Sequence, residues 1–220
     1  MKKKFSLLLL MITFLSSCNY DIVYSCDENI NDWVHDNLNA IQVMTRSDWN
    51  KIEEKFKIPV YRAFTLEQKV VFWNEKLADL LLLEWSDNEK IHIQSLITFI
   101  NEHQHFLNGY TLLSDDEKNV FDLFFHQWIY TAQNELKWNN KLLYAILATG
   151  HSLVDNKGTL DIYKNRSALL SYGESNCNCS TASDWCTPSN WDCLKVPCVE
   201  TSHGCGTLLV YLCDGRCGGY

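Results

Sequence analysis

Residues 65–81 read Thr-Leu-Glu-Gln-Lys-Val-Val-Phe-Trp-Asn-Glu-Lys-Leu-Ala-Asp-Leu-Leu, and this stretch indicates the kind of fold. It opens with a capping-box sequence, in which Thr65 stands at the N-cap and Gln68 at the third helical position. Apolar residues such as Val70, Trp73 and Leu77 then recur along one helical face. The stretch therefore predicts an amphipathic α-helix that packs against other helices.

The same start signal occurs twice more along the chain. Ser86 begins Ser-Asp-Asn-Glu and Ser114 begins Ser-Asp-Asp-Glu, and each precedes an apolar stripe at helical spacing. The pair Asn108-Gly109 predicts a left-handed stop after the helix that starts at Ser86. Two more helices of the same packed type are therefore expected.

Weaker patterns extend the helical region on both sides. A shorter helix is predicted over 141–149, and two weaker helices are predicted over 32–43 and 47–56. Pro59 is expected to separate these two from the helices that follow, because proline interrupts helix hydrogen bonding. Residues 18–150 are therefore predicted to form a mainly α-helical bundle.

The helical region contains few groups arranged for catalysis. Its histidines are scattered, and a helix would point His103 and His105 to different sides. There is no His-Glu-x-x-His pair, no glycine-rich phosphate loop and no Gly-x-Ser-x-Gly elbow. The carboxylates are spread over polar helix faces. We therefore expect a scaffold or partner surface that needs no cofactor, and not an enzyme.

The first residues have the features of an export signal. Three lysines precede the apolar run from Phe5 to Leu15, which is shorter than the ~20 residues of a membrane-spanning helix. Leu15-Ser16-Ser17-Cys18 then resembles a bacterial lipobox. The resemblance implies that residues 1–17 are removed, that Cys18 is lipidated and that this lipid anchors the protein in a bacterial envelope membrane. An ordinary signal peptide with Cys18 nearby by chance is the alternative.

The chain has ten cysteines, and eight of them stand in a short C-terminal module, residues 177–220. So short a module cannot bury enough apolar surface to fold on its core alone, and export permits disulfides. Four disulfides of unknown pairing are expected among Cys177, Cys179, Cys186, Cys193, Cys198, Cys205, Cys213 and Cys217. Residues 151–176 are predicted to be a linker.

Other roles for the cysteines have less support. No Cys-x-x-Cys knuckle pairs with a second one, so neither a metal site nor a thioredoxin-type redox pair is expected. Cys26 is left over once Cys18 is lipidated and the other eight are paired. It is expected to be a free thiol, to form an intermolecular bond, or to be a tolerated unpaired residue.

Within the module, residues 206–213 form a run typical of a β-strand. The pair Asp214-Gly215 follows and predicts a two-residue hairpin turn. Cys217 is then expected on a short return strand. The fold class is therefore a helical bundle with a small disulfide-rich β and loop module after it.

Three parts of the module together resemble the fulvocin C bacteriocin family. They are Asn178-Cys179-Ser180-Thr181-Ala182-Ser183-Asp184-Trp185-Cys186, then Gly204-Cys205-Gly206, then Cys213-Asp214-Gly215. The lipoprotein-like, helical front is similar to the longer fulvocin C-related proteins of Bacteroidota. The resemblance implies a cystine-stapled antibacterial peptide that acts on related bacteria, with four disulfides.

Charge limits the partners. The chain has a net charge of −8, which argues against nucleic-acid binding. The module has two basic and four acidic residues, so its charge is −2 and cationic attraction to anionic lipid is not available. A specific envelope target is therefore expected. Its candidate contacts are Trp185, Trp191 and Tyr211, unless these aromatic side chains only cover the cystines.

Three functions are compatible with these features. The helical domain could carry a bacteriocin until cleavage near 173–176. Alternatively, the module is a cell-surface interaction head that is never cleaved and does not kill. The third hypothesis is a small secreted enzyme inhibitor, although no residue in the sequence indicates a reactive loop.

Overall fold

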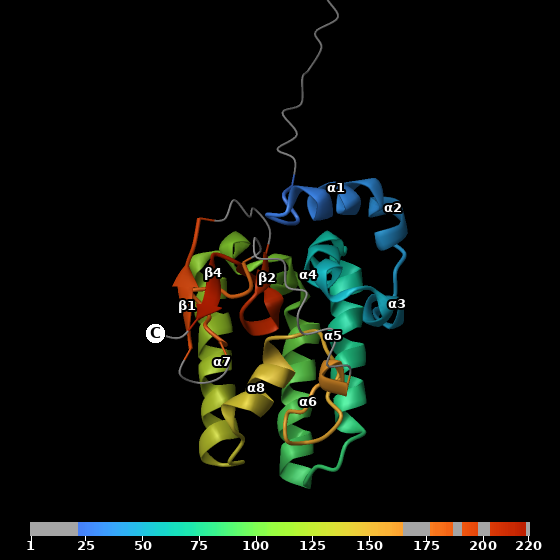
Figure 1. The fold of residues 1–220 in the computed structure, drawn as a ribbon. Helices are drawn as coiled ribbons and strands as arrows, with labels where there is room; N and C mark the ends of the chain where they lie inside the picture. The colour runs from blue at the N-terminus through green and yellow to red at the C-terminus, as the bar shows by residue number, and fades with distance from the viewer. Residues whose placement is uncertain (1–21, 165–176, 187–190, 198–202, 219–220) are drawn as a thin grey trace, which may run out of the picture.

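The computed structural model describes residues 22–164, 177–186, 191–197 and 203–218, and three of its long helices begin at the capping boxes. They are α5 (Leu66–Leu81), α6 (Asp87–Glu102) and α7 (Asp115–Asn134). Each cap hydroxyl accepts from the N–H of the third helical residue, whose side chain accepts from the N–H of the cap. The three helices lie side by side in alternating directions (Figure 1), so the predicted bundle is confirmed.

Helix α6 ends before the predicted stop. Its last residue is Glu102, and the chain continues through two 3-10 helices, η1 (Gln104–Asn108) and η2 (Tyr110–Leu112). Gly109 between them has a φ of 132°, so the glycine serves a turn between 3-10 helices. Phe106 and Leu107 are buried in the core, and the early change of direction brings them there.

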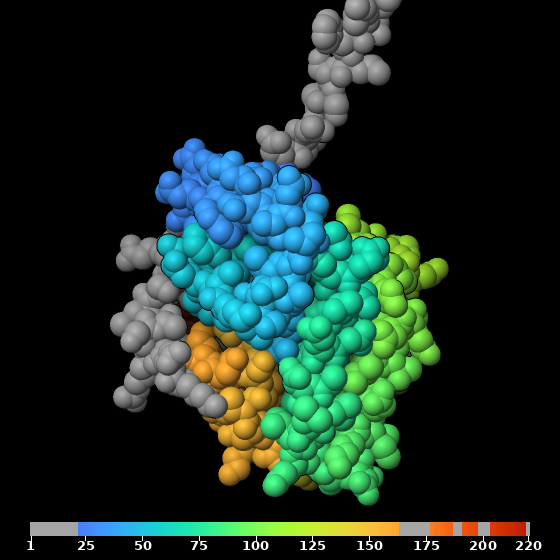
Figure 2. All heavy atoms as spheres, turned by 90° about the vertical axis from the view of Figure 1, so that its right-hand side faces the viewer, coloured from blue at the N-terminus to red at the C-terminus, as the bar shows by residue number. Residues whose placement is uncertain are grey.

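Four short helices precede the bundle, where the sequence predicted two. They are α1 (Glu28–Asp36), α2 (Leu38–Ile41), α3 (Arg46–Lys51) and α4 (Glu54–Ala63). Asn37 divides the first pair because its backbone leaves the helical region, at φ −108° and ψ 9°. Figure 2 shows α5 and α6 on one face of the molecule, with these N-terminal helices over one end.

The expectation that Pro59 separates helices is wrong, because Pro59 lies inside α4. Proline removes one backbone hydrogen bond, which costs a helix stability. The neighbouring Val60 and Tyr61 are fully buried, so tertiary packing holds the helix together through the proline.

A buried lysine joins α5 to the end of α8 (Asn140–Leu147), which agrees with the predicted helix over 141–149. Lys76 Nζ donates to the carbonyls of Ile146 and Thr149. The last carbonyls of a helix have no partner within the helix, so this lysine satisfies one of them from outside. Burial, with some repulsion from Arg46, holds the pKa of Lys76 well below its usual value.

Gly150, which follows α8, has no room for a side chain. A Cβ there would lie 2.7 Å from Phe72 Cζ and 2.7 Å from Trp49 Cη2, and these two rings already meet edge to face. We expect Gly150→Ala to lower the free energy of unfolding by about 1–3 kcal/mol through overpacking. Denaturant unfolding measures this.

Gly218→Ala is the matched control for that substitution. Its Cβ would meet only the flexible side chain of Leu194, with Cδ1 at 3.2 Å and Cγ at 4.0 Å. A Gly150→Ala protein as stable as this control would show that the rings move aside without cost.

The first part of the predicted linker packs against the bundle. Leu153 and Leu160 form an antiparallel bridge, and Val154 N donates to Thr159 O at 2.9 Å. His151 and Leu160 are buried, and the short η3 (Asp161–Lys164) follows. The remainder of the linker, 165–176, lies outside the described residues.

The module forms two small antiparallel sheets. Strand β1 (Asp192–Lys195) pairs with β4 (Gly215–Gly218), and β2 (His203–Cys205) pairs with β3 (Tyr211–Leu212). The predicted hairpin at Asp214-Gly215 is therefore wrong, since the strands before and after it have different partners.

The course of the chain at this point explains the error. The N–H groups of Asp214 and Gly215 both donate to the carbonyl of Cys179, at 3.1 and 3.2 Å. A two-residue hairpin would instead place these groups between two paired strands. The contact to Cys179 carries the last strand away from β3 and toward β1.

Three disulfides join residues of the module to one another. They are Cys179–Cys193, Cys186–Cys217 and Cys205–Cys213, with Cα–Cα distances of 5.8, 5.4 and 5.2 Å. Cys177 is also disulfide-bonded, and Cys198 lies outside the described residues. Cys26 packs against a small buried cluster that contains Cys177. The predicted disulfide-rich module is confirmed.

Only part of the predicted strand 206–213 is a strand. Thr207–Leu209 form a 3-10 turn, η5, in which Leu208 and Leu209 have φ values of 53° and 57°. Positive φ is unfavourable for leucine by about 1–2 kcal/mol per residue. The surrounding contacts must therefore hold these two residues in place.

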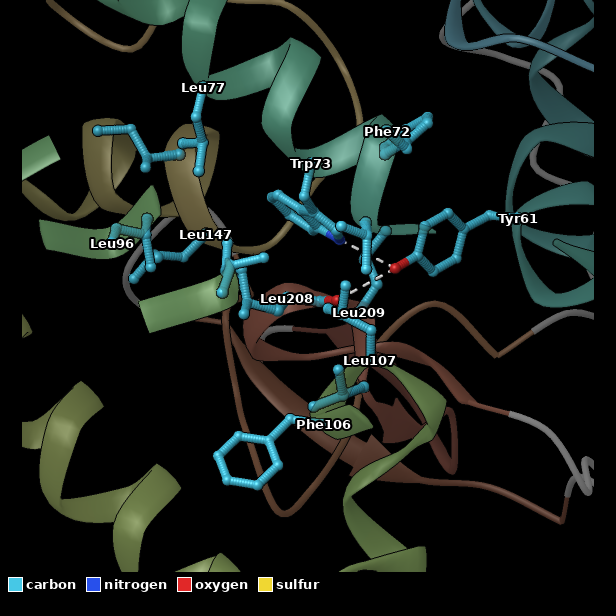
Figure 3. Packing of buried hydrophobic residues seen from close by; sticks show 14 of the residues in the cluster. Tyr61, Phe72, Trp73, Leu77, Leu96, Phe106, Leu107, Leu147, Leu208 and Leu209 are labelled. Carbon is cyan, nitrogen blue, oxygen red and sulfur yellow. Dashed lines mark hydrogen bonds between the residues drawn. The ribbon is translucent and has the colours of Figure 1, made fainter. Parts of the chain in front are cut away.

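These contacts come from the helices, because residues 208–211 lie in the hydrophobic core of the bundle (Figure 3). Leu208 is 1% exposed and Leu209 2% exposed. Tyr61 Oη donates to Leu208 O at 3.4 Å and accepts from Trp73 Nε1 at 2.9 Å. We call residues 208–211 the inserted segment; through it the bundle and the module share one core.

The predicted signal, residues 1–17, and Cys18 lie outside the described residues. Among the residues that are described, no helix has the length and apolar character needed to span a membrane.

Candidate functional site

A pocket of about 370 Å³ lies where the bundle meets the module. Helix α4 and the segment after α8 form one wall, and the cystine module forms the other. This volume is within the usual range for small-molecule sites, roughly 300–1,000 Å³, and such sites favour the junction between two parts of a fold. The pocket is therefore the candidate functional site.

A charged cluster occupies the bundle wall of the pocket. His151 Nε2 lies 2.8 Å from Glu54 Oε1, and His151 Nδ1 lies 3.6 Å from Asp161 Oδ1. Lys57 Nζ lies 3.4 Å from Glu54 Oε2 and packs over the Trp49 ring. Two carboxylates and two basic groups thus alternate along the cluster, in which Asp161 lies behind His151 and does not itself line the pocket.

The contacts within this cluster favour the charged forms of His151, Glu54 and Asp161. Burial alone would lower the pKa of His151, but its contacts to Asp161 and Glu54 outweigh burial and raise it. Burial would raise the pKa values of Glu54 and Asp161, yet His151 and Lys57 hold both below the usual range. Each of these three groups is therefore stabilised by a neighbour of opposite charge.

The pocket has no side chain of the cluster or of Ser183 arranged as a nucleophile with a free base among the described residues. Both ring nitrogens of His151 face carboxylates, so neither is open toward a substrate. Ser183 also lines the pocket, but its hydroxyl lies 3.1 Å from Thr207 Oγ1 and accepts from Thr207 N. Nucleophilic catalysis needs a base that is free to take the hydroxyl proton.

Two of the three aromatic residues proposed as target contacts line this pocket. Trp185 is half-buried, and its Nε1 donates to Thr207 Oγ1 at 3.0 Å. Trp191 is 41% exposed. The structure thus places both in the lining of the same pocket as Glu54, Lys57 and His151, which the sequence did not associate with them.

The third residue, Tyr211, has a different environment. It is 9% exposed, and its ring stacks on Tyr110 with the centroids 4.5 Å apart. Burial raises the pKa of its hydroxyl. Tyr211 belongs to the core and is not presented to a partner.

Three cysteine sulfurs gather at one point in the module. Cys179, Cys186 and Cys193 have Sγ atoms within 4.8 Å of one another. All three are in disulfides, two of them with each other. Metal ligation by cysteine uses the thiolate, so this sulfur group is explained by neighbouring cystines.

Sequence reasoning missed Glu54, Lys57 and His151. His151 is 97 residues from Glu54 along the chain. No local motif links them, because they lie on a helix and on a loop that only the folded bundle brings together. A histidine directly after Gly150, where the sequence predicts the end of a helix, was the one available signal.

Polar contacts also hold the module against the helices near the pocket. Arg62 Nε donates to His203 O at 3.1 Å, and Lys69 Nζ lies 2.8 Å from His203 Nε2. Tyr110 N donates to Val210 O at 2.8 Å. These contacts join β2 and the inserted segment to three separate parts of the bundle.

Comparison with protein-family models, with curated proteins and with solved structures found no match to this chain.

Proposed function

We propose that this chain is an exported, bacteriocin-related envelope lipoprotein whose cystine module acts as a binding head while attached to the helical domain. The sequence Leu15-Ser16-Ser17-Cys18 supports lipid anchoring through Cys18. The observation that carries the proposal of attachment is the inserted segment, which is part of the core of the bundle.

The energetics of the inserted segment favour a head that stays in place. Fully burying a leucine or valine side chain stabilises by about 1.5–3 kcal/mol. Leu208, Leu209 and Val210 are all buried at this site. Separation of the module would expose these side chains to water and would also open the bundle core. Cleavage of the linker alone is therefore not expected to release the module.

Release as an antibacterial peptide is the second candidate function. The three disulfides in the described part of the chain all close within the module, so they would survive cleavage of the linker. The resemblance to fulvocin C also supports this function. With a module charge of −2, such a peptide would need a specific target on the competing cell.

Cleavage of the intact protein distinguishes the two functions. We expect a protein with a protease site inserted in 165–176 to remain one species after cutting, because the inserted segment stays bound. Size-exclusion chromatography without denaturant measures this, and the cut sample in denaturant serves as the control for complete cleavage. Co-elution supports attachment. A module that elutes alone and inhibits growth of a related strain would establish the released peptide instead.

A further inference from the structure

The pocket at the junction has two chemically different walls. The bundle wall has titratable side chains, Glu54, Lys57 and His151, and the module wall has the indoles of Trp185 and Trp191. A ligand that touches both walls needs hydrogen-bonding groups on one side and an apolar face on the other.

Most charges around the pocket are paired with an opposite charge. Lys57 lies against Glu54, and His151 lies between the carboxylates of Glu54 and Asp161. Lys55 Nζ lies 3.3 Å from Glu53 Oε2. The guanidinium of Arg62 donates to the backbone carbonyls of His203 and Tyr24, and these bonds use donors of the group but leave its positive charge.

A purely apolar ligand is disfavoured. It would cover ionised groups that hydrogen-bond, and burying such groups without new partners costs free energy. Lys57 is buried, and among the described residues its ammonium contacts one carboxylate, that of Glu54, and the face of Trp49. An ammonium has three donors, so a ligand with several hydroxyls would supply it with further acceptors and would also donate to the Glu54 carboxylate.

We infer that this pocket binds a small neutral saccharide, with sugar hydroxyls on the Glu54–Lys57–His151 wall and a sugar face against the indoles of Trp185 and Trp191. Sugar rings combine hydroxyl edges with C–H faces, which matches the two walls, and a neutral ligand leaves the existing pairs of opposite charges intact. The inference rests on the proposed attachment of the module, because only the attached module completes the pocket.

Isothermal titration calorimetry on the intact, uncut protein tests the inference. The probes are the neutral disaccharides cellobiose, maltose and N,N′-diacetylchitobiose. We expect at least one of them to bind, and Trp191→Ala to weaken that binding about tenfold through the loss of an aromatic contact. Trp191 is 41% exposed, so this variant is expected to fold. Lys57→Met is expected to weaken the same binding through the loss of hydrogen bonds.

Tyr130→Ala is the matched control, because Tyr130 is a 58% exposed aromatic residue on α7 that does not line the pocket. It should bind the disaccharide as the unaltered protein does. Absence of binding for all three disaccharides, or equal weakening by Tyr130→Ala, would overturn the inference. Preferred binding of glucuronic acid over the neutral sugars would also overturn it. Neither result bears on whether the cut module stays attached, so the two proposals can fail separately.

Discussion

Replacing Leu209 by alanine is expected to lower the free energy of unfolding of the helices by about 2–5 kcal/mol. Leu209 is 2% exposed and packs in the same cluster as the bundle residues Trp73 and Leu107. The substitution would leave a cavity where the module enters the bundle. Alanine and leucine both have a Cβ, so both pay the same conformational cost at this positive φ. The change in unfolding free energy therefore reports mainly the lost packing.

Urea unfolding followed by far-UV circular dichroism, without a reducing agent, measures the effect on the helices. Leu82→Ala is the control, because Leu82 is 84% exposed and its loss should change stability by no more than about 0.5 kcal/mol. If Leu209→Ala leaves helix unfolding unchanged, then the module and the bundle are independent units, and the shared core does not stabilise the helices.

Replacing His203 by glutamine is expected to make the protein less sensitive to acid. Burial, together with the charges of Lys69 and Arg62, lowers the pKa of His203 to about 3 from a usual value of 6.5. Below pH 6.5 the unfolded chain binds a proton at His203, whereas the folded protein does not bind one until the pH approaches 3. The free energy of unfolding therefore falls as the pH falls from 6.5 toward 3. For His203 alone this loss is about 3 kcal/mol between pH 7 and pH 4.

Glutamine keeps an acceptor for Lys69 Nζ but does not titrate. The unfolding free energy of each protein, measured at pH 7 and pH 4, gives the loss on acidification. We expect this loss to be smaller in His203→Gln than in the unaltered protein. His126→Gln is the control, since His126 is an exposed histidine on α7 and should follow the unaltered protein. An equal loss in all three proteins would mean that His203 is protonated in the folded state.

The helices of this protein were predictable because their signals are local. A capping box occupies four consecutive residues, and the apolar stripe that follows has a fixed period. Thr65, Ser86 and Ser114 therefore marked three helix starts without knowledge of the rest of the chain. The disulfide-rich character of the module followed equally from the local density of cysteine.

Local signals failed where distant partners decided the outcome. Pro59 was expected to end a helix, but buried neighbours keep α4 intact around it. Asp214-Gly215 was expected to form a hairpin, but hydrogen bonds to Cys179 send the following strand to β1. Propensity describes the chain without its surroundings, and packing overrides it when the energies compete.

By itself, therefore, the sequence determined the helical bundle, its three capped helices and the cystine module, because each depends on residues close together in the chain. Only the tertiary structure decided that residues 208–211 enter the bundle core, and that His151 meets Glu54 in a pocket that Trp191 also lines. The contacts of Tyr61 with Leu208 and of His151 with Glu54 join residues 147 and 97 positions apart. They form only when burial of apolar surface brings whole helices and strands together. A pattern of neighbouring residues does not predict which distant segments will make contact.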